Sequence, residues 1–131
     1  MKKEELMIGD WVQDDEPDAD GIIIRYKVEA EDFTNEAFMN GIEPIPITSE
    51  ILFDNGFSKY NDGCYERHYT YVLLSEYTNL KLFALYDCDF SYNMNHEAWK
   101  IKYVHELQHV IHLCHIDKDI QLDIEVNYKN K

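Results

Sequence analysis

The sequence predicts a small α+β protein in which a curved, mostly antiparallel sheet packs against one short and one long helix. Three observations predict this class. Runs of β-branched and aromatic residues that alternate with polar ones indicate strands. A capped segment at residues 48–55 indicates the short helix. Apolar residues spaced by three and four over residues 99–114 indicate the long helix.

The first part of the chain, residues 1–47, is expected to be β-rich and acidic. Residues 6–12 and 22–30 favour strands, and an acidic, turn-rich loop separates them. Residues 43–47 (EPIPI) must be extended, because each proline disfavours the helical conformation of the residue before it. We therefore expect a small curved sheet here, SH3-like in type.

The remaining part, residues 48–131, is expected to add the two helices and more strands. Thr48 is a good N-cap, and Asn55-Gly56 can end the short helix. The elements expected after it are strands at 65–74 and 80–88 joined around 76–79, a loop at 89–97, the long helix at 99–114 and a strand at 120–126. No linker or repeat divides the chain, so we expect one domain over residues 1–131.

Charge is the most unusual property of the sequence. It holds 26 acidic and 12 basic residues, a net charge of −14. Residues 1–66 carry 17 acids and five bases, so most of the excess lies there. Such a chain repels phosphate backbones and anionic membranes, so we expect neither as a direct partner. The asymmetry instead favours a partner protein with a basic surface, although the charge could serve solubility alone. The candidate contact residues are Asp14, Asp15, Glu16, Asp18 and Asp20.

The sequence shows no feature of a secreted or membrane protein. No apolar run reaches the roughly 20 residues that span a bilayer, and the N-terminus lacks the apolar core of a signal peptide. Cys64, Cys88 and Cys114 are too few and too widely spaced for a disulfide framework. We expect a cytoplasmic protein, and the sequence leaves homo-oligomerisation open.

One motif indicates a different function. His105, Glu106 and His109 form an HExxH sequence, in which two histidines on one helix face hold zinc and the glutamate acts as general base. His115 stands where a longer form of the motif has its third ligand, and an acid, Asp117, Asp119 or Glu125, could take that place instead. However, His112 replaces the glycine at which that helix must break, and the histidines are expected to face solvent, opposite the apolar stripe. A small zinc hydrolase is therefore the alternative, and the main expectation is no cofactor and no catalytic residue.

A third alternative is a pocket protein that sequesters a small ligand. A nucleotide would need a local basic pocket, and Arg25, Lys27 and Arg67 are the residues that could form one. The aromatic residues of the predicted strands are interpreted as core and cross-strand pairs, because no basic groove accompanies them.

Three segments, LMIGDWV at 6–12, IEPIPITSEILFDNGF at 42–57 and KYVHELQHVIHL at 102–113, resemble a group of small uncharacterised proteins. The group occurs in gut anaerobic bacteria and in their phages and prophages, and no activity is established for it. The resemblance implies glutamine at the position of Glu106 and asparagine at that of His109, which favours a packing helix. Together with the charge, it leads us to expect a non-enzymatic phage or mobile-element protein that inhibits a host defence protein in the bacterial cytoplasm.

Overall fold

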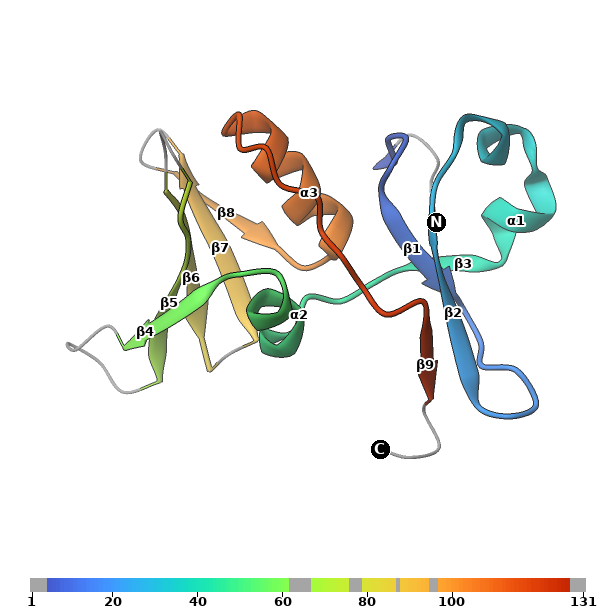
Figure 1. Ribbon diagram of the computed structural model, residues 1–131, viewed down its shortest axis with the longest axis horizontal. Helices are drawn as coiled ribbons and strands as arrows, with labels where there is room; N and C mark the ends of the chain where they lie inside the picture. Colours follow the sequence, from blue (N-terminus) through green and yellow to red (C-terminus); the bar gives the residue numbers. More distant parts are fainter. Residues whose placement is uncertain (1–4, 62–66, 76–78, 87, 95–96, 128–131) are drawn as a thin grey trace. The chain divides into compact units, whose positions relative to one another are not determined.

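The computed structural model describes residues 5–61, 67–75, 79–86, 88–94 and 97–127 (Figure 1). It confirms the α+β class, with two antiparallel sheets and short helices. The chain divides into two compact units. Unit 1 comprises Met1–Ile45 and Leu122–Lys131, and unit 2 comprises Pro46–Gln121. That both units form one domain stays a prediction.

Unit 1 is built around a four-stranded antiparallel sheet. Its strands, in spatial order, are β3 (Ile42–Pro44), β1 (Trp11–Asp14), β2 (Ile22–Lys27) and β9 (Glu125–Asn127). Val12 pairs with both Tyr26 and Pro44, which places it at the centre of the sheet and leaves it fully buried. Because β9 pairs with β2, the two ends of the chain complete the same sheet.

Two short helical segments follow β2. A 3-10 helix, η2 (Ala30–Thr34), leads to α1 (Glu36–Asn40), whose N-cap Asn35 accepts a hydrogen bond from the Phe38 N–H at 3.1 Å. The unit buries a cluster of apolar side chains: Leu6, Val12, Val28, Met39 and Ile42. Tyr26 and Phe38 meet edge to face beside this cluster, at a centroid distance of 5.4 Å.

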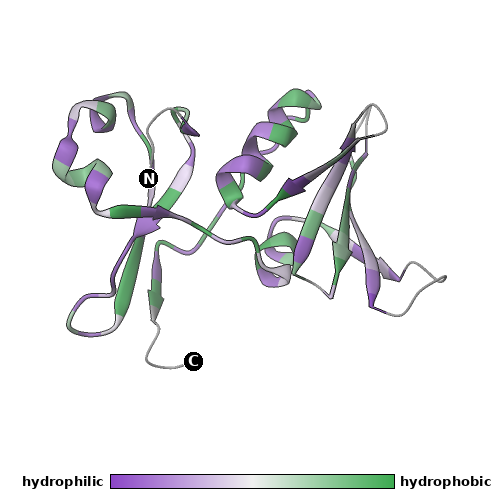
Figure 2. Ribbon diagram, turned by 180° about the vertical axis from the view of Figure 1, so that it is seen from behind, coloured by the Kyte–Doolittle hydropathy of each residue, from purple (hydrophilic) through white to green (hydrophobic). Residues whose placement is uncertain are grey.

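Unit 2 is built around a five-stranded antiparallel sheet. In spatial order its strands are β4 (Ser58–Asn61), β5 (His68–Leu73), β6 (Leu80–Leu85), β7 (Asp89–Met94) and β8 (Glu97–Ile101). The helices α2 (Ser49–Asp54) and α3 (Val104–Leu113) lie on the same side of this sheet (Figures 1 and 2). Phe53 of α2 lies 5.9 Å from Tyr71 of β5, measured between ring centroids.

The short helix has the predicted ends. Thr48 Oγ1 accepts a hydrogen bond from the Ile51 N–H at 3.2 Å, and Gly56 has a φ of +91° just after the C-cap Asn55. The predicted hairpin is also present, with Leu73 paired to Leu80. Its turn at 76–78 and the start of the predicted strand, residues 65–66, lie outside the described residues, as does Cys64.

Several other expectations were wrong. The long helix begins at Val104 and not at residue 99, because residues 97–101 form the edge strand β8. The expected loop at 89–97 contains β7, which pairs with both β6 and β8. The closing strand is limited to β9, and the first strand begins at Trp11, after a turn in which Gly9 has a φ of +93°.

The sequence pattern did not predict η2, α1 and β4. Each of these elements has only four or five residues, which is too short to give a clear hydrophobic period. Within the described ranges, no helix has the length and apolar character needed to cross a lipid bilayer.

Candidate functional site

The acidic loop of unit 1 connects β1 to β2 and has a defined shape. Asp18 Oδ1 accepts hydrogen bonds from the backbone N–H groups of Asp20, at 2.9 Å, and Ile22, at 3.0 Å. The Gly21 N–H donates to the Asp18 carbonyl at 2.9 Å, and its φ of +80° suits glycine. The carboxylate of Asp18 therefore serves mainly to hold the turn.

Asp14 also has a structural role. It is half-buried at the end of β1, and its Oδ2 accepts a hydrogen bond from the Ile24 N–H at 3.4 Å. Burial raises the pKa of the Tyr26 hydroxyl, and a hydrogen bond to the Asp14 carboxylate and its charge raise that pKa further. The side chain of Asp14 therefore bonds to residues of β2 and is less available to a partner than a fully exposed acid.

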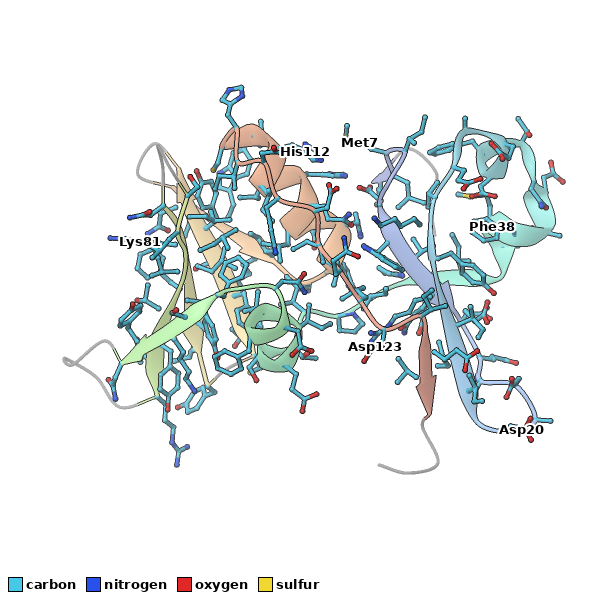
Figure 3. The ribbon with its side chains drawn as sticks, viewed as in Figure 1. Met7, Asp20, Phe38, Lys81, His112 and Asp123 are labelled. Carbon is cyan, nitrogen blue, oxygen red and sulfur yellow. The ribbon has the colours of Figure 1, made fainter. Side chains whose placement is uncertain are left out.

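The other three candidates, Asp15, Glu16 and Asp20, are exposed. Figure 3 shows Asp20 at the tip of the loop, with its carboxylate pointing away from the sheet. The structure therefore brings all five predicted residues together on one hairpin but gives them two roles: Asp14 and Asp18 shape the loop, and the remaining three present charge to solvent.

Acidic residues extend beyond this loop. Unit 1 as a whole holds 15 acidic and six basic residues, and unit 2 holds 11 and six, so both units are acidic and unit 1 more so. Around η2, a hydrogen bond to Glu31 raises the pKa of Glu29, and the charges of Glu31 and Asp32 raise it further. This second group of close carboxylates belongs to the same unit as the loop and was not singled out from the sequence.

The HExxH motif lies at the start of α3, where its glutamate acts as a helix cap. Glu106 Oε1 accepts hydrogen bonds from the backbone N–H groups of Lys102 and Tyr103, each at 3.0 Å. A glutamate at the third helical position commonly binds back to the N-cap in this way. Its negative charge also suits the N-terminal end of the helix dipole. The sequence motif suggests that this carboxylate acts as a general base. Helix capping is a structural reason for a glutamate at the same position.

The helical periodicity predicted that the histidines of the motif face solvent, but the structure buries one of them. His105 is only 4% exposed, because the rings of neighbouring residues lie against it. The Tyr103 ring stacks on the His105 ring at a centroid distance of 5.9 Å. The His109 ring meets the His105 ring edge to face, at a centroid distance of 5.8 Å and an interplanar angle of 75°. His112 and His115 are exposed, and His115 lies beyond the helix with a φ of +56°.

Two of the three proposed zinc ligands, His105 and His109, are therefore brought together. The described ranges contain no group of three or more histidine, cysteine, aspartate or glutamate residues placed to hold one metal ion. Structural zinc sites use four protein ligands, and catalytic sites use three. His115 does not complete a site with the pair.

The residues considered for a basic pocket are divided between the two units. Arg25 and Lys27 lie on β2 of unit 1, where the Lys27 ammonium sits 5.5 Å from the centre of the Trp11 ring. Arg67 belongs to unit 2, and its guanidinium lies 5.4 Å from the Tyr86 ring. Neither unit alone therefore contains all three residues of the basic pocket that a nucleotide-binding protein would need.

Asn55 is a structural residue whose full role the sequence did not reveal. It is 1% exposed, and its side-chain amide donates to the carbonyls of Ile51, at 2.8 Å, and Gln121, at 2.9 Å. Its Oδ1 accepts from the Gln121 N–H at 2.6 Å. The sequence signalled only a helix end at Asn55, because the contact joins residues 66 positions apart.

Compared with known proteins, the chain matches no protein-family model, no curated protein and no solved structure.

Proposed function

We propose that this is a non-enzymatic binding protein that occupies a basic surface of another protein through the acidic surface of unit 1. The observation that supports this most is the β1–β2 loop, in which Asp18 fixes the turn and Asp15, Glu16 and Asp20 remain exposed. A loop with a fixed shape loses little conformational entropy on binding, so its charges can contribute more to affinity.

The charge distribution suits such a role. A surface of one sign attracts a partner of the opposite sign and raises the association rate, and the effect weakens as salt screens the charges. Unit 1 has more than twice as many acidic as basic residues. A basic protein groove is the chemistry that complements it.

The helix cap supports a non-enzymatic role over the zinc hydrolase alternative. A general base must reach the metal-bound water, whereas the Glu106 carboxylate binds two backbone N–H groups. The resemblance to phage and prophage proteins points the same way, since glutamine, which it implies at this position, can also cap a helix. On that resemblance, we propose that the partner is a host defence protein of the bacterial cytoplasm and that the bound protein inhibits it.

Affinity capture from host lysate tests the proposal. The bait is compared with a loop variant carrying Asp15→Asn, Glu16→Gln and Asp20→Asn. A matched control carries Asp54→Asn, Asp117→Asn and Asp119→Asn, three exposed acids of unit 2, and so has the same net charge as the loop variant. We expect a partner that the wild type and the control retain and the loop variant loses. Equal capture by both variants would refute the role of the loop.

A further inference from the structure

The outer face of the sheet of unit 2, opposite α2 and α3, combines aromatic, hydroxyl and basic side chains. Alternation along β6 buries Leu80, Leu82 and Ala84 and turns Lys81 and Phe83 outward. Figure 3 shows Lys81 on the side of the sheet away from both helices. We call this surface, defined by the outward residues Tyr60, His68, Thr70, Lys81, Phe83, Leu85, Asp89, Ser91 and Lys100, the outer sheet face.

Phe83 lies at the centre of this face. The strand register places its partners in one row across the sheet: Tyr60, Thr70, Phe83, Ser91 and Lys100. The immediate neighbours of Phe83 in the row, Thr70 and Ser91, are small hydroxyl residues, and its side chain is 38% exposed. An aromatic ring between short neighbours on an open sheet is available for stacking.

A hollow of about 200 Å³ lies beside this ring. His68 and Asp89 flank Leu85 across neighbouring strands, and with Phe83 and Ser91 they line the hollow. Pockets for whole drug-sized ligands usually measure about 300–1,000 Å³, so this hollow suits a single ring of a larger molecule. Its carboxylate, imidazole and hydroxyl groups can bind the polar edge of such a ring.

The charge of this face differs from that of the chain. Among its described residues, Lys81 and Lys100 are basic and Asp89 is the one acid, whereas the chain carries a net −14. Lys81 lies two residues from Phe83, about 7 Å along the strand, and Lys100 lies two strands away, about 10 Å across the sheet. Both lysines are exposed and within reach of an anionic group on a ligand that stacks on Phe83.

We propose that the outer sheet face binds a free mononucleotide, with the base stacked on Phe83 and the phosphate bound by Lys81 and Lys100. Charge complementarity selects an anion, and the exposed ring beside the hollow selects one that carries an aromatic base. A single nucleotide is preferred to a nucleic acid strand, because each added phosphate increases repulsion from the acidic chain. This site is separate from the acidic loop and does not depend on the protein-binding function proposed above.

The test is titration of the full chain with AMP, GMP, CMP and UMP in turn, followed by calorimetry and NMR. We expect at least one to bind saturably with a Kd near or below about 1 mM. Phe83→Ala should weaken binding by about 5- to 150-fold, the range typical of the loss of one stacking ring. Phe83→Trp, which keeps a ring, should retain it. If Phe83→Ala does not fold, Phe83→Leu provides the same comparison.

A charge control separates phosphate binding from a general charge effect. Lys81→Gln with Lys100→Gln should weaken binding and reduce its salt dependence, whereas Lys27→Gln with Lys118→Gln, which removes two lysines elsewhere, should leave it unchanged. The unphosphorylated nucleosides should bind more weakly. Absence of saturable binding up to about 10 mM would overturn the proposal. So would unchanged affinity in the Phe83 variants, or tighter binding of a ten-residue oligothymidylate than of every monophosphate.

Discussion

The carboxylate of Glu106 accepts a hydrogen bond from the backbone N–H of Tyr103 at 3.0 Å, and this contact sets where α3 begins. The same Oε1 atom accepts from Lys102, so one side chain satisfies two backbone donors at the end of the helix. A residue that a sequence pattern assigns to catalysis is thereby explained by helix capping.

Glu106→Ala should therefore lower the free energy of unfolding by about 1 kcal/mol, the typical value for a lost helix cap. Glu106→Gln should lose less, because its amide oxygen still accepts the backbone hydrogen bonds. Urea denaturation measures both, and His112→Ala, an exposed residue of the same helix, provides the control. Equal stability of the alanine and glutamine variants would argue against the cap.

The same geometry leads to an expectation about zinc. Protein purified without a histidine tag should contain no stoichiometric zinc, because His105 and His109 find no third ligand in the described parts of the chain. Treatment with a chelator should leave the melting temperature unchanged. Elemental analysis by mass spectrometry measures the metal content. One zinc per chain, together with hydrolytic activity lost in Glu106→Gln, would restore the hydrolase alternative.

The sequence predicted the elements with strong local signals. Thr48 and Gly56 marked the ends of α2 correctly, because capping depends on neighbouring residues. An apolar residue at position 99 fits the helical period, so the sequence predicts Trp99 within the long helix. Its pairing with Tyr92 instead makes it part of β8, and pairing partners cannot be identified from periodicity alone.

The sequence predicted which acidic residues form the candidate site, but not the structural role that each of them has. Charge alone identifies the five acids of the hairpin, yet the role of Asp18 in holding the turn depends on a geometry that appears only in the fold. Phe83 was interpreted as a core or cross-strand residue. The alternation along β6 is compatible with either set of side chains facing outward. The pairing of Leu82 with the buried Tyr71, and of Ala84 with the buried Phe90, decides which set faces the core.

Asn55 should be among the most sensitive polar positions. Asn55→Ala removes three buried or partly buried hydrogen bonds and leaves the backbone of Gln121 without its partners, so we expect a loss of about 2–4 kcal/mol. Denaturant unfolding measures it. Asn93→Ala, at an exposed position of β7, should stay within about 0.5 kcal/mol of the wild type. A comparable loss in both variants would contradict the role of the Asn55 contacts.

Asp18 should matter for the shape of the acidic loop. Asp18→Asn keeps an oxygen that accepts from Asp20 and Ile22, whereas Asp18→Ala removes it at a cost of about 1 kcal/mol. Amide hydrogen exchange at Asp20 and Ile22 should accelerate in the alanine variant alone. If both variants exchange alike, charge and not hydrogen bonding explains the effect of this residue.

The hydrogen bond from Glu29 to Glu31, together with the charges of Glu31 and Asp32, predicts a pH dependence of stability around η2. The pKa of Glu29 is raised in the folded protein, so the unfolded chain releases this proton first as the pH rises above about 4.5. Ionisation of Glu29 therefore costs stability as the pH rises, and the cost is complete above the folded pKa. Glu29→Gln should be more stable than the wild type at pH 7, and the difference should vanish at pH 3.

Thermal unfolding at both pH values measures this difference. Glu36→Gln, which removes one charge from the first turn of α1, should show no such gain, because a negative charge is favourable there. A Glu29→Gln variant no more stable than the wild type at neutral pH would contradict the account of the cluster.

The association rate of the captured partner, followed by surface plasmon resonance at increasing salt, distinguishes guidance by the acidic loop from a general effect of net charge. If the acidic loop of unit 1 guides binding, the loop variant should associate about tenfold more slowly than the wild type at low salt, and the two rates should converge as salt is added. The matched unit 2 variant should behave as the wild type does. Equal slowing in both triple variants would contradict the claim, because net charge and not the loop would then govern binding.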